Sequence, residues 1–243
     1  MTAEIAVRSL GEGPRVVMLH CDASTGAADW RKQEVLAERW QLIIPDRPGY
    51  GESPRVRVDF LVETEAHRPL LGDGAHLVGH SYGGVVALLL AAQNPDRVRS
   101  LTVIEPPAFG ITEHPAVVRT RHELNALWTE ELPTLEFYRR FSRAIGEREW
   151  PDRPLPAALE DGVASLMRER APWHAHPDFE ALAAAPFPLL SISGGHHPAF
   201  EAVCDVIAER TGAERTILGG KRHMVPQVGS ALNEVLEDFW HRS

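Results

Sequence analysis

Residues 75–93 read AHLVGHSYGGVVALLLAAQ and contain the strongest structural signal in the chain. A short apolar run is followed by the pattern G-x-S-x-G around Ser81, and then by a run that is apolar nearly all round a helix. The pattern predicts a buried strand, a tight turn and a buried helix. Gly79 and Gly83 carry no side chains where the turn crowds its neighbours, so Ser81 is expected to stand at a helix N-terminus as a candidate nucleophile. The alternative is a serine that caps the helix.

Further apolar, β-rich runs recur along the chain, and most are continuous rather than alternating. Such runs are typical of strands buried on both faces of a largely parallel sheet. Residues 199–212 show an amphipathic helical pattern that ends at a glycine. Strands that alternate with helices predict an α/β fold, a mostly parallel sheet flanked by helices. The other expected strands span residues 3–10 at the sheet edge, 15–19, 41–45, 100–105, 188–193 and 214–218.

The alternation of strands and helices stops between residues 109 and 186, where helical patterns are separated by prolines. A stretch this long is not a loop of a compact domain, so we expect a helical cap, or lid, inserted into a core of residues 1–108 and 187–243. Ligands of such folds bind beyond the carboxyl ends of the strands. Because the cap leaves the strand at 100–105, it is expected to cover that edge.

The composition is that of a globular protein, with 243 residues of which 44% are hydrophobic and 24% charged. The formal net charge of −9 argues against nucleic acid or an anionic membrane as a partner. Cys21 and Cys204 are too few for a disulfide framework and fit a reducing compartment. Since no run is long enough to span a bilayer and no signal-peptide pattern is found, the sequence predicts a cytoplasmic protein.

Four segments resemble, in order and spacing, segments of the α/β-hydrolase family. GHSYGG (79–84) resembles its nucleophile elbow, and IIPDRPGYGESP (43–54) resembles its D-x-x-G-x-G-x-S segment. VVMLHCDASTGAADW (16–30) resembles the oxyanion loop with its downstream tryptophan, and GGKRHMVPQ (219–227) resembles the loop of the catalytic histidine. The resemblance covers nearly the whole chain outside the helical insertion. It implies an esterase-like serine hydrolase with a Ser-His-acid triad.

His223 is the candidate base, because a serine hydroxyl is a poor nucleophile until a neighbouring base accepts its proton. It follows the last expected strand and a glycine-rich turn, which places it at the same sheet edge as Ser81. It also matches the family's histidine loop. His80, inside the elbow, is expected to pack or to hydrogen-bond locally, and the resemblance implies a structural role for His20.

The acid of the triad departs from the commonest pattern of the family. Where many members carry an aspartate, this chain reads SISGGHHPAF, with His196 or His197 at the expected position. Neither histidine can stabilise an imidazolium as a carboxylate does. Glu105 is the candidate acid because it ends the strand at 100–105. That strand is expected to be buried, and a carboxylate at its end needs a partner. Some members, including the haloalkane dehalogenases, place their acid after this strand, the family's sixth.

The order Ser81, Glu105, His223 also keeps the family's order of nucleophile, acid and base. The alternative for Glu105 is a surface glutamate at a strand end. In that case Glu201 or Asp205, on the following helix, would supply the acid.

The oxyanion hole is expected to use backbone N–H groups of Tyr82, after the nucleophile, and of Asp22, after His20. Cys21 stands where the family commonly has glycine. The carboxylate of Asp22 would be unfavourable beside a developing oxyanion unless it points away, so it is expected to hold the loop, to bind substrate or water, or to be partly protonated. Cys21 as a second nucleophile is the less favoured alternative to a small loop residue.

These features predict a serine hydrolase that cleaves a small carboxylic ester or lactone through an acyl-enzyme on Ser81. Hydrolysis of a thioester, an amide or a carbon–carbon bond uses the same triad and stays open, as does a ligand-binding protein with little turnover. Dehalogenase and epoxide hydrolase chemistry would put an aspartate at the elbow, and Ser81 counts against both.

The triad chemistry needs no metal or organic cofactor. A metal site at His174 and His176 in the insertion is disfavoured because no further ligand cluster accompanies them, and surface or pocket-lining roles are favoured instead. Large side chains of the insertion are candidates to line an apolar acyl pocket, with cap packing as the alternative for each. These candidate substrate-binding residues are Phe109, Trp128, Phe137, Tyr138 and Trp173.

Overall fold

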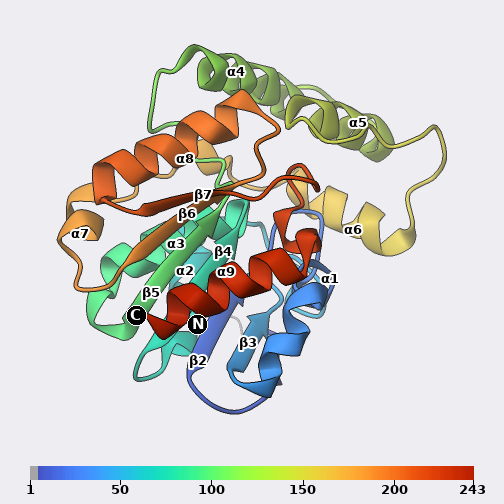
Figure 1. Cartoon of the computed structure of the whole chain (residues 1–243). Helices are drawn as coiled ribbons and strands as arrows, with labels where there is room; N and C mark the ends of the chain where they lie inside the picture. The colour runs from blue at the N-terminus through green and yellow to red at the C-terminus, as the bar shows by residue number, and fades with distance from the viewer. Residues whose placement is uncertain (1–4) are drawn as a thin grey trace.

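The computed structural model describes residues 5–243, which form one seven-stranded sheet with helices on both faces (Figure 1). The strands are β1 (Val7–Leu10), β2 (Arg15–Leu19), β3 (Gln41–Pro45), β4 (Ala75–His80), β5 (Val98–Ile104), β6 (Leu189–Ser193) and β7 (Glu214–Ile217). Their order in the sheet is β1-β3-β2-β4-β5-β6-β7. Strand β1 is antiparallel to β3, and all other pairs are parallel. The predicted mostly parallel sheet is confirmed, and β1 lies at its edge; residues 3 and 4 of that expected strand lie outside the described residues.

The core has two layers, one on each face of the sheet. Successive strand residues alternate between the layers: Val17 and Leu19 pack into one, and Val16 and Met18 pack into the other. This alternation is the expected consequence of strand geometry, and it explains why β2 reads as a continuous apolar run. Helices α2 (Phe60–His67), α3 (Tyr82–Gln93) and α8 (Pro198–Thr211) cover the first face, while η1 (Arg31–Glu38) and α9 (Ser230–His241) cover the second.

The helices predicted from the sequence are present, with their ends extended or capped as the residues dictate. Helix α3 contains the predicted residues 85–93 and begins at Tyr82, directly after the elbow serine. Helix α8 ends at Gly212, whose φ of 73° is in the left-handed region that favours glycine. Within residues 5–243 no helix is both long and apolar enough to cross a lipid bilayer. Short elements complete the core: α1 (Gly26–Asp29), η2 (Arg68–Leu71), η3 (Pro95–Arg97) and η5 (Val225–Val228).

Residues 109–186 form helices joined by loops and contribute no strand to the sheet. Helices α4 and α5 lie above the edge at which the strands end (Figure 1), so this segment covers the side of the sheet where Ser81 stands. Its treatment as a separate cap domain stays a prediction. The elements of the segment are α4 (Pro115–Thr129), α5 (Thr134–Ala144), α6 (Ala157–Leu166), η4 (Pro172–His174) and α7 (Phe179–Ala184).

Candidate active site

Ser81 occupies a sharp turn between β4 and α3. Its φ of 53° lies in the left-handed region, which a non-glycine residue adopts only under constraint. The constraint comes from its neighbours, because a Cβ at Gly79 would lie 2.3 Å from the Gly83 carbonyl oxygen. A Cβ at Gly83 would lie 2.4 Å from the carbonyl oxygen of Leu19. Both glycines are therefore required for the close packing that presents the Ser81 hydroxyl at the N-terminus of α3.

Ser81, His223 and Glu105 form a continuous chain of hydrogen bonds. The Ser81 hydroxyl donates to Nε2 of His223 at 2.9 Å. Nδ1–H of the same ring donates to Oε2 of Glu105 at 2.7 Å. Glu105 is completely buried, and its carboxylate needs a hydrogen on Nδ1, which leaves Nε2 free to accept the serine proton. This is the protonation pattern that a histidine needs to act as a general base on a hydroxyl.

The second oxygen of the Glu105 carboxylate has one backbone donor and a neighbouring imidazole ring. Its Oε1 accepts a hydrogen bond from the Gly194 backbone N–H at 2.6 Å and lies 3.3 Å from Nδ1 of His196. Burial alone would raise the pKa of Glu105, but the His196 and His223 rings outweigh it and lower the pKa from 4.5 to about 2. His196 stands where the sequence lacks the commoner aspartate. It contacts the acid that replaces that aspartate, and its Nε2 binds the carbonyl of Ile145 at 3.0 Å.

We expect the stability of the fold to depend on Glu105 between about pH 4.5 and pH 2. Because the folded-state pKa is lowered, the ionised carboxylate stabilises the fold fully above its ordinary pKa, and this contribution is lost as pH falls toward 2. At about pH 3 the wild type should have lost about 2 kcal/mol through this one group. Urea unfolding of wild type and Glu105→Gln at about pH 5.5 and pH 3 measures the difference. Equal declines in both proteins would contradict the expectation.

Residues 145–147 hold the loop of His223 from the side of the helical segment. The Glu147 carboxylate accepts the backbone N–H of His223 at 2.7 Å, and the Gly146 carbonyl accepts from Nη1 of Arg222 at 2.7 Å. Sequence reasoning missed this connection, because it joins residues 76 positions apart through groups that have no motif. The helical segment therefore covers the site and also fixes its base.

The two proposed oxyanion donors, Tyr82 and Asp22, come from different segments, and their role in an oxyanion hole stays a prediction. Tyr82 begins α3, and its hydroxyl donates away from the site to the Arg170 carbonyl at 3.2 Å. Cys21 and Asp22 line the same cavity as Ser81 and His223. Burial raises the pKa of the Cys21 thiol to about 11, so the thiol is neutral near pH 7. A thiol in this state is a weak nucleophile.

The Asp22 carboxylate belongs to a buried charge cluster. Its Oδ1 accepts from Nη1 of Arg47 at 3.0 Å and from the Tyr50 hydroxyl at 3.4 Å. Arg47 also donates to Glu63, with Nε to Oε2 at 2.7 Å. Glu169 lies 3.5 Å from the same tyrosine hydroxyl; burial first, and then the charge of Asp22, raises its pKa well above 4.5. The ion pair with Arg47 supports the loop-holding role expected for the Asp22 carboxylate, and the other roles expected for it stay predictions.

The predicted pocket residues divide into two groups. Tyr138 lines a cavity of about 170 Å³ that contains Ser81 and His223. Trp128 and Trp173 line a smaller inner cavity beside the same serine, together with Glu169. Phe109 and Phe137 are completely buried and line neither cavity.

Phe109 packs against Trp173 and Phe200, and Phe137 packs against Trp128 and Phe141. The prediction that Phe109 and Phe137 line the pocket is therefore wrong. Both residues pack behind the aromatic side chains that form its wall. Hydrophobic periodicity could not distinguish a residue that lines the cavity from one that packs behind it, since both kinds of residue are apolar.

The remaining sequence candidates lie away from the reacting groups. His20 accepts the backbone N–H of Arg47 at Nε2, and burial lowers its pKa to about 3, so it is a neutral structural residue. Glu201 and Asp205, the alternative acids, both pair with Arg215 at 2.7 and 2.8 Å. His174 and His176 are exposed.

Comparison with known proteins defines the class to which this fold and site belong. The family model described as "Alpha/beta hydrolase family" matches residues 16–235. The chain therefore belongs to the alpha/beta hydrolase family. A solved alpha/beta hydrolase from Sphaerobacter thermophilus superposes with a TM-score of 0.75 at 26% identity, over 97% of this chain and 96% of that one.

Several curated relatives, including the following two, carry the names of enzymes. Pimeloyl-[acyl-carrier protein] methyl ester esterase of Chromobacterium violaceum is 41% identical over 102 residues, which are 40% of this chain and 39% of the relative. A 2-hydroxy-6-oxo-6-phenylhexa-2,4-dienoate hydrolase of Burkholderia cepacia is 32% identical over 118 residues, 44% of this chain and 41% of the relative. These matches span about two fifths of the length of the relatives. This chain is thus a hydrolase-family protein whose distant relatives include esterases.

Proposed function

We propose that this protein is a serine hydrolase that cleaves a small carboxylic ester or lactone through an acyl-enzyme on Ser81. The observation that carries the proposal is the unbroken chain of hydrogen bonds from the Ser81 hydroxyl through His223 to the buried Glu105. A nucleophile, a base and an orienting acid in this order form the general arrangement for acyl transfer. A serine with a purely structural role would need neither His223 nor Glu105 beside it.

In the first half of the reaction, Nε2 of His223 takes the proton of Ser81 while Oγ attacks the carbonyl carbon. Glu105, with its pKa lowered to about 2, stays ionised near pH 7 and stabilises the imidazolium that forms. The backbone N–H groups of Tyr82 and Asp22 bind the oxyanion of the tetrahedral intermediate. The imidazolium then gives its proton to the leaving alcohol, which departs and leaves the acyl group on Ser81.

In the second half, water enters and His223 takes one of its protons as the oxygen attacks the acyl carbon. The tetrahedral intermediate collapses, the proton returns to Oγ of Ser81, and the carboxylic acid leaves. Arg47 supports this step indirectly, because its ion pair with Asp22 offsets the negative charge of that carboxylate near the developing oxyanion. This ion pair supports the proposal that an acidic residue is compatible with the oxyanion hole at position 22.

The size and lining of the cavity support a small substrate. The cavity that contains Ser81 measures about 170 Å³, below the roughly 300–1,000 Å³ of sites for drug-sized ligands. Its wall includes the apolar groups of Phe141, Ile145 and Met224. The esterase relative, named for a methyl ester, also favours a small alcohol as the leaving group.

A chain-length series tests the proposed substrate class. We expect kcat/KM for p-nitrophenyl acetate and butyrate to exceed that for the decanoate by at least about tenfold, because a decanoyl chain is too large for a cavity of about 170 Å³ and must displace its packed wall, at a cost of about 1–3 kcal/mol. Simple lactones and methyl esters extend the series. A preference for the longest acyl chain would contradict the assignment, and the absence of all hydrolysis would favour a ligand-binding protein.

Carbon–carbon bond hydrolysis is the second candidate. The relative named as a hydrolase of 2-hydroxy-6-oxo-6-phenylhexa-2,4-dienoate supports it, over 118 residues. The same Ser81 and His223 would serve, and the two reactions separate on substrate. A protein that cleaves the dienoate and leaves every ester and lactone intact would replace the ester assignment.

A further inference from the structure

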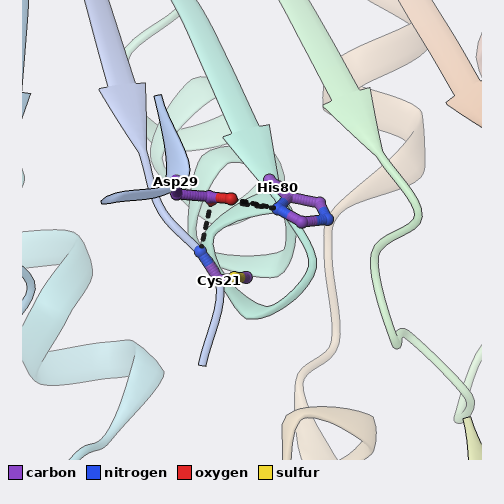
Figure 2. Close-up of side chains that lie close together, drawn as sticks. All are labelled: Cys21, Asp29 and His80. Atoms are coloured by element: carbon purple, nitrogen blue, oxygen red, sulfur yellow. Dashed lines mark hydrogen bonds and ion pairs between the residues drawn. The ribbon is translucent and has the colours of Figure 1, made fainter. Parts of the chain in front are cut away.

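Asp29 and His80 form a second carboxylate–imidazole pair (Figure 2), and His80 directly precedes Ser81 in the chain. Asp29 comes from α1 and His80 from the end of β4, and both side chains are completely buried. The carboxylate oxygens of Asp29 lie 2.9 and 3.1 Å from Nδ1 of His80. Cys21, the third side chain of the group, comes from the loop after β2. None of the three takes part in the steps derived above.

The hydrogen bonds of His80 indicate that it is an imidazolium. Its Nδ1 faces the Asp29 carboxylate and its Nε2 lies 2.8 Å from the backbone carbonyl of His223. A carbonyl oxygen can only accept, and an ionised carboxylate can only accept, so both ring nitrogens must carry hydrogens. Burial would lower the pKa of His80, but the charge of Asp29 outweighs it and raises the pKa well above 6.5. In turn, His80 lowers the pKa of Asp29 against the effect of burial.

The same geometry argues against a metal ion in this group. The donor atoms of Cys21, Asp29 and His80 lie within 4.8 Å of one another. However, two ligands of a tetrahedral zinc ion, each at about 2.0–2.1 Å, lie about 3.3 Å apart. The 2.9 Å separation of Asp29 and His80 is that of a charge-assisted hydrogen bond. The group is an ion pair with a neutral thiol beside it.

The pair connects all three loops that carry the chemistry. Oδ2 of Asp29 accepts the backbone N–H of Cys21 at 3.0 Å, next to the proposed oxyanion donor Asp22. His80 directly precedes Ser81, and its Nε2 holds the His223 carbonyl. The charged and titratable groups around the His80 ring are Asp29 from α1, Cys21 from the loop after β2, and the His223 ring at 5.2 Å between centroids.

We propose that Asp29 and His80 are positioning residues: a buried carboxylate–imidazolium pair that sets the oxyanion loop, the nucleophile elbow and the catalytic histidine against one another. This proposal rests on the proposed hydrolase function for its effect on rate, whereas the ion pair itself does not depend on that function. A displacement of a reacting group by about 1 Å lowers the rate by on the order of 10²-fold. The pair therefore acts on kcat through His223 and Asp22, and leaves substrate affinity nearly unchanged.

NMR of the resting protein tests the protonation state without any substrate. With histidine labelled by ¹⁵N in the ring, we expect both His80 nitrogens at imidazolium shifts at about pH 8, where a free histidine is neutral. The signal is assigned by its loss in His80→Gln, and Asp29→Asn should return the ring to one protonated nitrogen. A wild-type His80 with one bare ring nitrogen at that pH would overturn the ion pair.

Rates test the positioning role. His80→Gln keeps a donor for the His223 carbonyl but removes the charge and the bond to Asp29, so kcat for p-nitrophenyl acetate should fall by on the order of 10²-fold with KM changed less than about threefold. The matched control is His76→Gln, a second buried histidine of β4 that bonds Ser100 at 2.8 Å, away from the site. Urea unfolding of both variants separates lost stability from lost positioning.

The outcomes distinguish this proposal from the proposed function. If the wild type hydrolyses no ester, the function fails, and the rate at which a fluorophosphonate labels Ser81 replaces turnover as the measurement. Wild type should then label on the order of 10²-fold faster than His80→Gln. Equal kcat or equal labelling in His80→Gln and His76→Gln would overturn the positioning role.

Discussion

Ser81→Ala is expected to lower kcat for p-nitrophenyl acetate by on the order of 10⁶-fold, the size of effect seen when a triad serine is removed. Alanine removes the Oγ that forms the acyl-enzyme and leaves His223 with no proton to accept. It keeps the Cβ, so the turn at φ 53° carries the same backbone constraint and the fold should be retained. Steady-state rates of wild type and variant on the same ester measure the loss.

Ser142→Ala is the matched control for this change. Ser142 lines the same cavity and is slightly more buried than Ser81, and the described structure gives its hydroxyl no bond to His223. Its replacement should alter kcat/KM by no more than a few-fold. A Ser81→Ala protein that keeps a tenth of wild-type activity would remove Ser81 from the chemistry.

Glu105→Gln is expected to lower kcat by on the order of 10⁴-fold, as the change from acid to amide does in a serine protease triad. Glutamine is nearly isosteric, so the cavity is kept, but a neutral amide cannot stabilise the imidazolium of His223. It also presents an N–H where Nδ1–H needs an acceptor, which favours the wrong tautomer or a turned ring. The substitution therefore acts on the hydrogen bond of 2.7 Å between His223 and Glu105.

Glu201→Gln provides the comparison, because Glu201 was the alternative acid in the sequence. In the structure it accepts from Arg215 and from the Ser193 hydroxyl, at 2.7 and 2.8 Å. Its replacement should cost some stability at the end of β6 and leave kcat within a few-fold of wild type. Near-full activity in Glu105→Gln together with a large loss in Glu201→Gln would exchange the two roles.

Much of the fold and part of the site could be predicted from the sequence because local signals dominate there. Continuous apolar runs locate the parallel strands, and the glycines on either side of Ser81 encode a turn that only small residues permit. Glu105 could be chosen because its strand is buried and Pro106 directs the chain out of the sheet. Each of these inferences uses only neighbouring residues or the order of strands.

The supporting contacts could not be predicted, since they depend on side chains that meet only after folding. Glu147 and His196 approach the triad from distant segments, and their sequences carry no motif for that role. The ion pair with Arg47 accounts for the presence of the acidic Asp22 beside the proposed oxyanion hole. The sequence shows that Asp22 is acidic, but it does not show that Arg47 becomes its partner after folding.

The central claim is that acyl transfer passes through Ser81, and the most direct measurement is the mass of the protein during turnover. Wild type mixed with p-nitrophenyl acetate and quenched in acid should carry one acetyl group, found after digestion on the peptide that contains Ser81. Ser81→Ala should carry none. Turnover with no acetyl group on Ser81, or with the acetyl group on Cys21, would contradict the account.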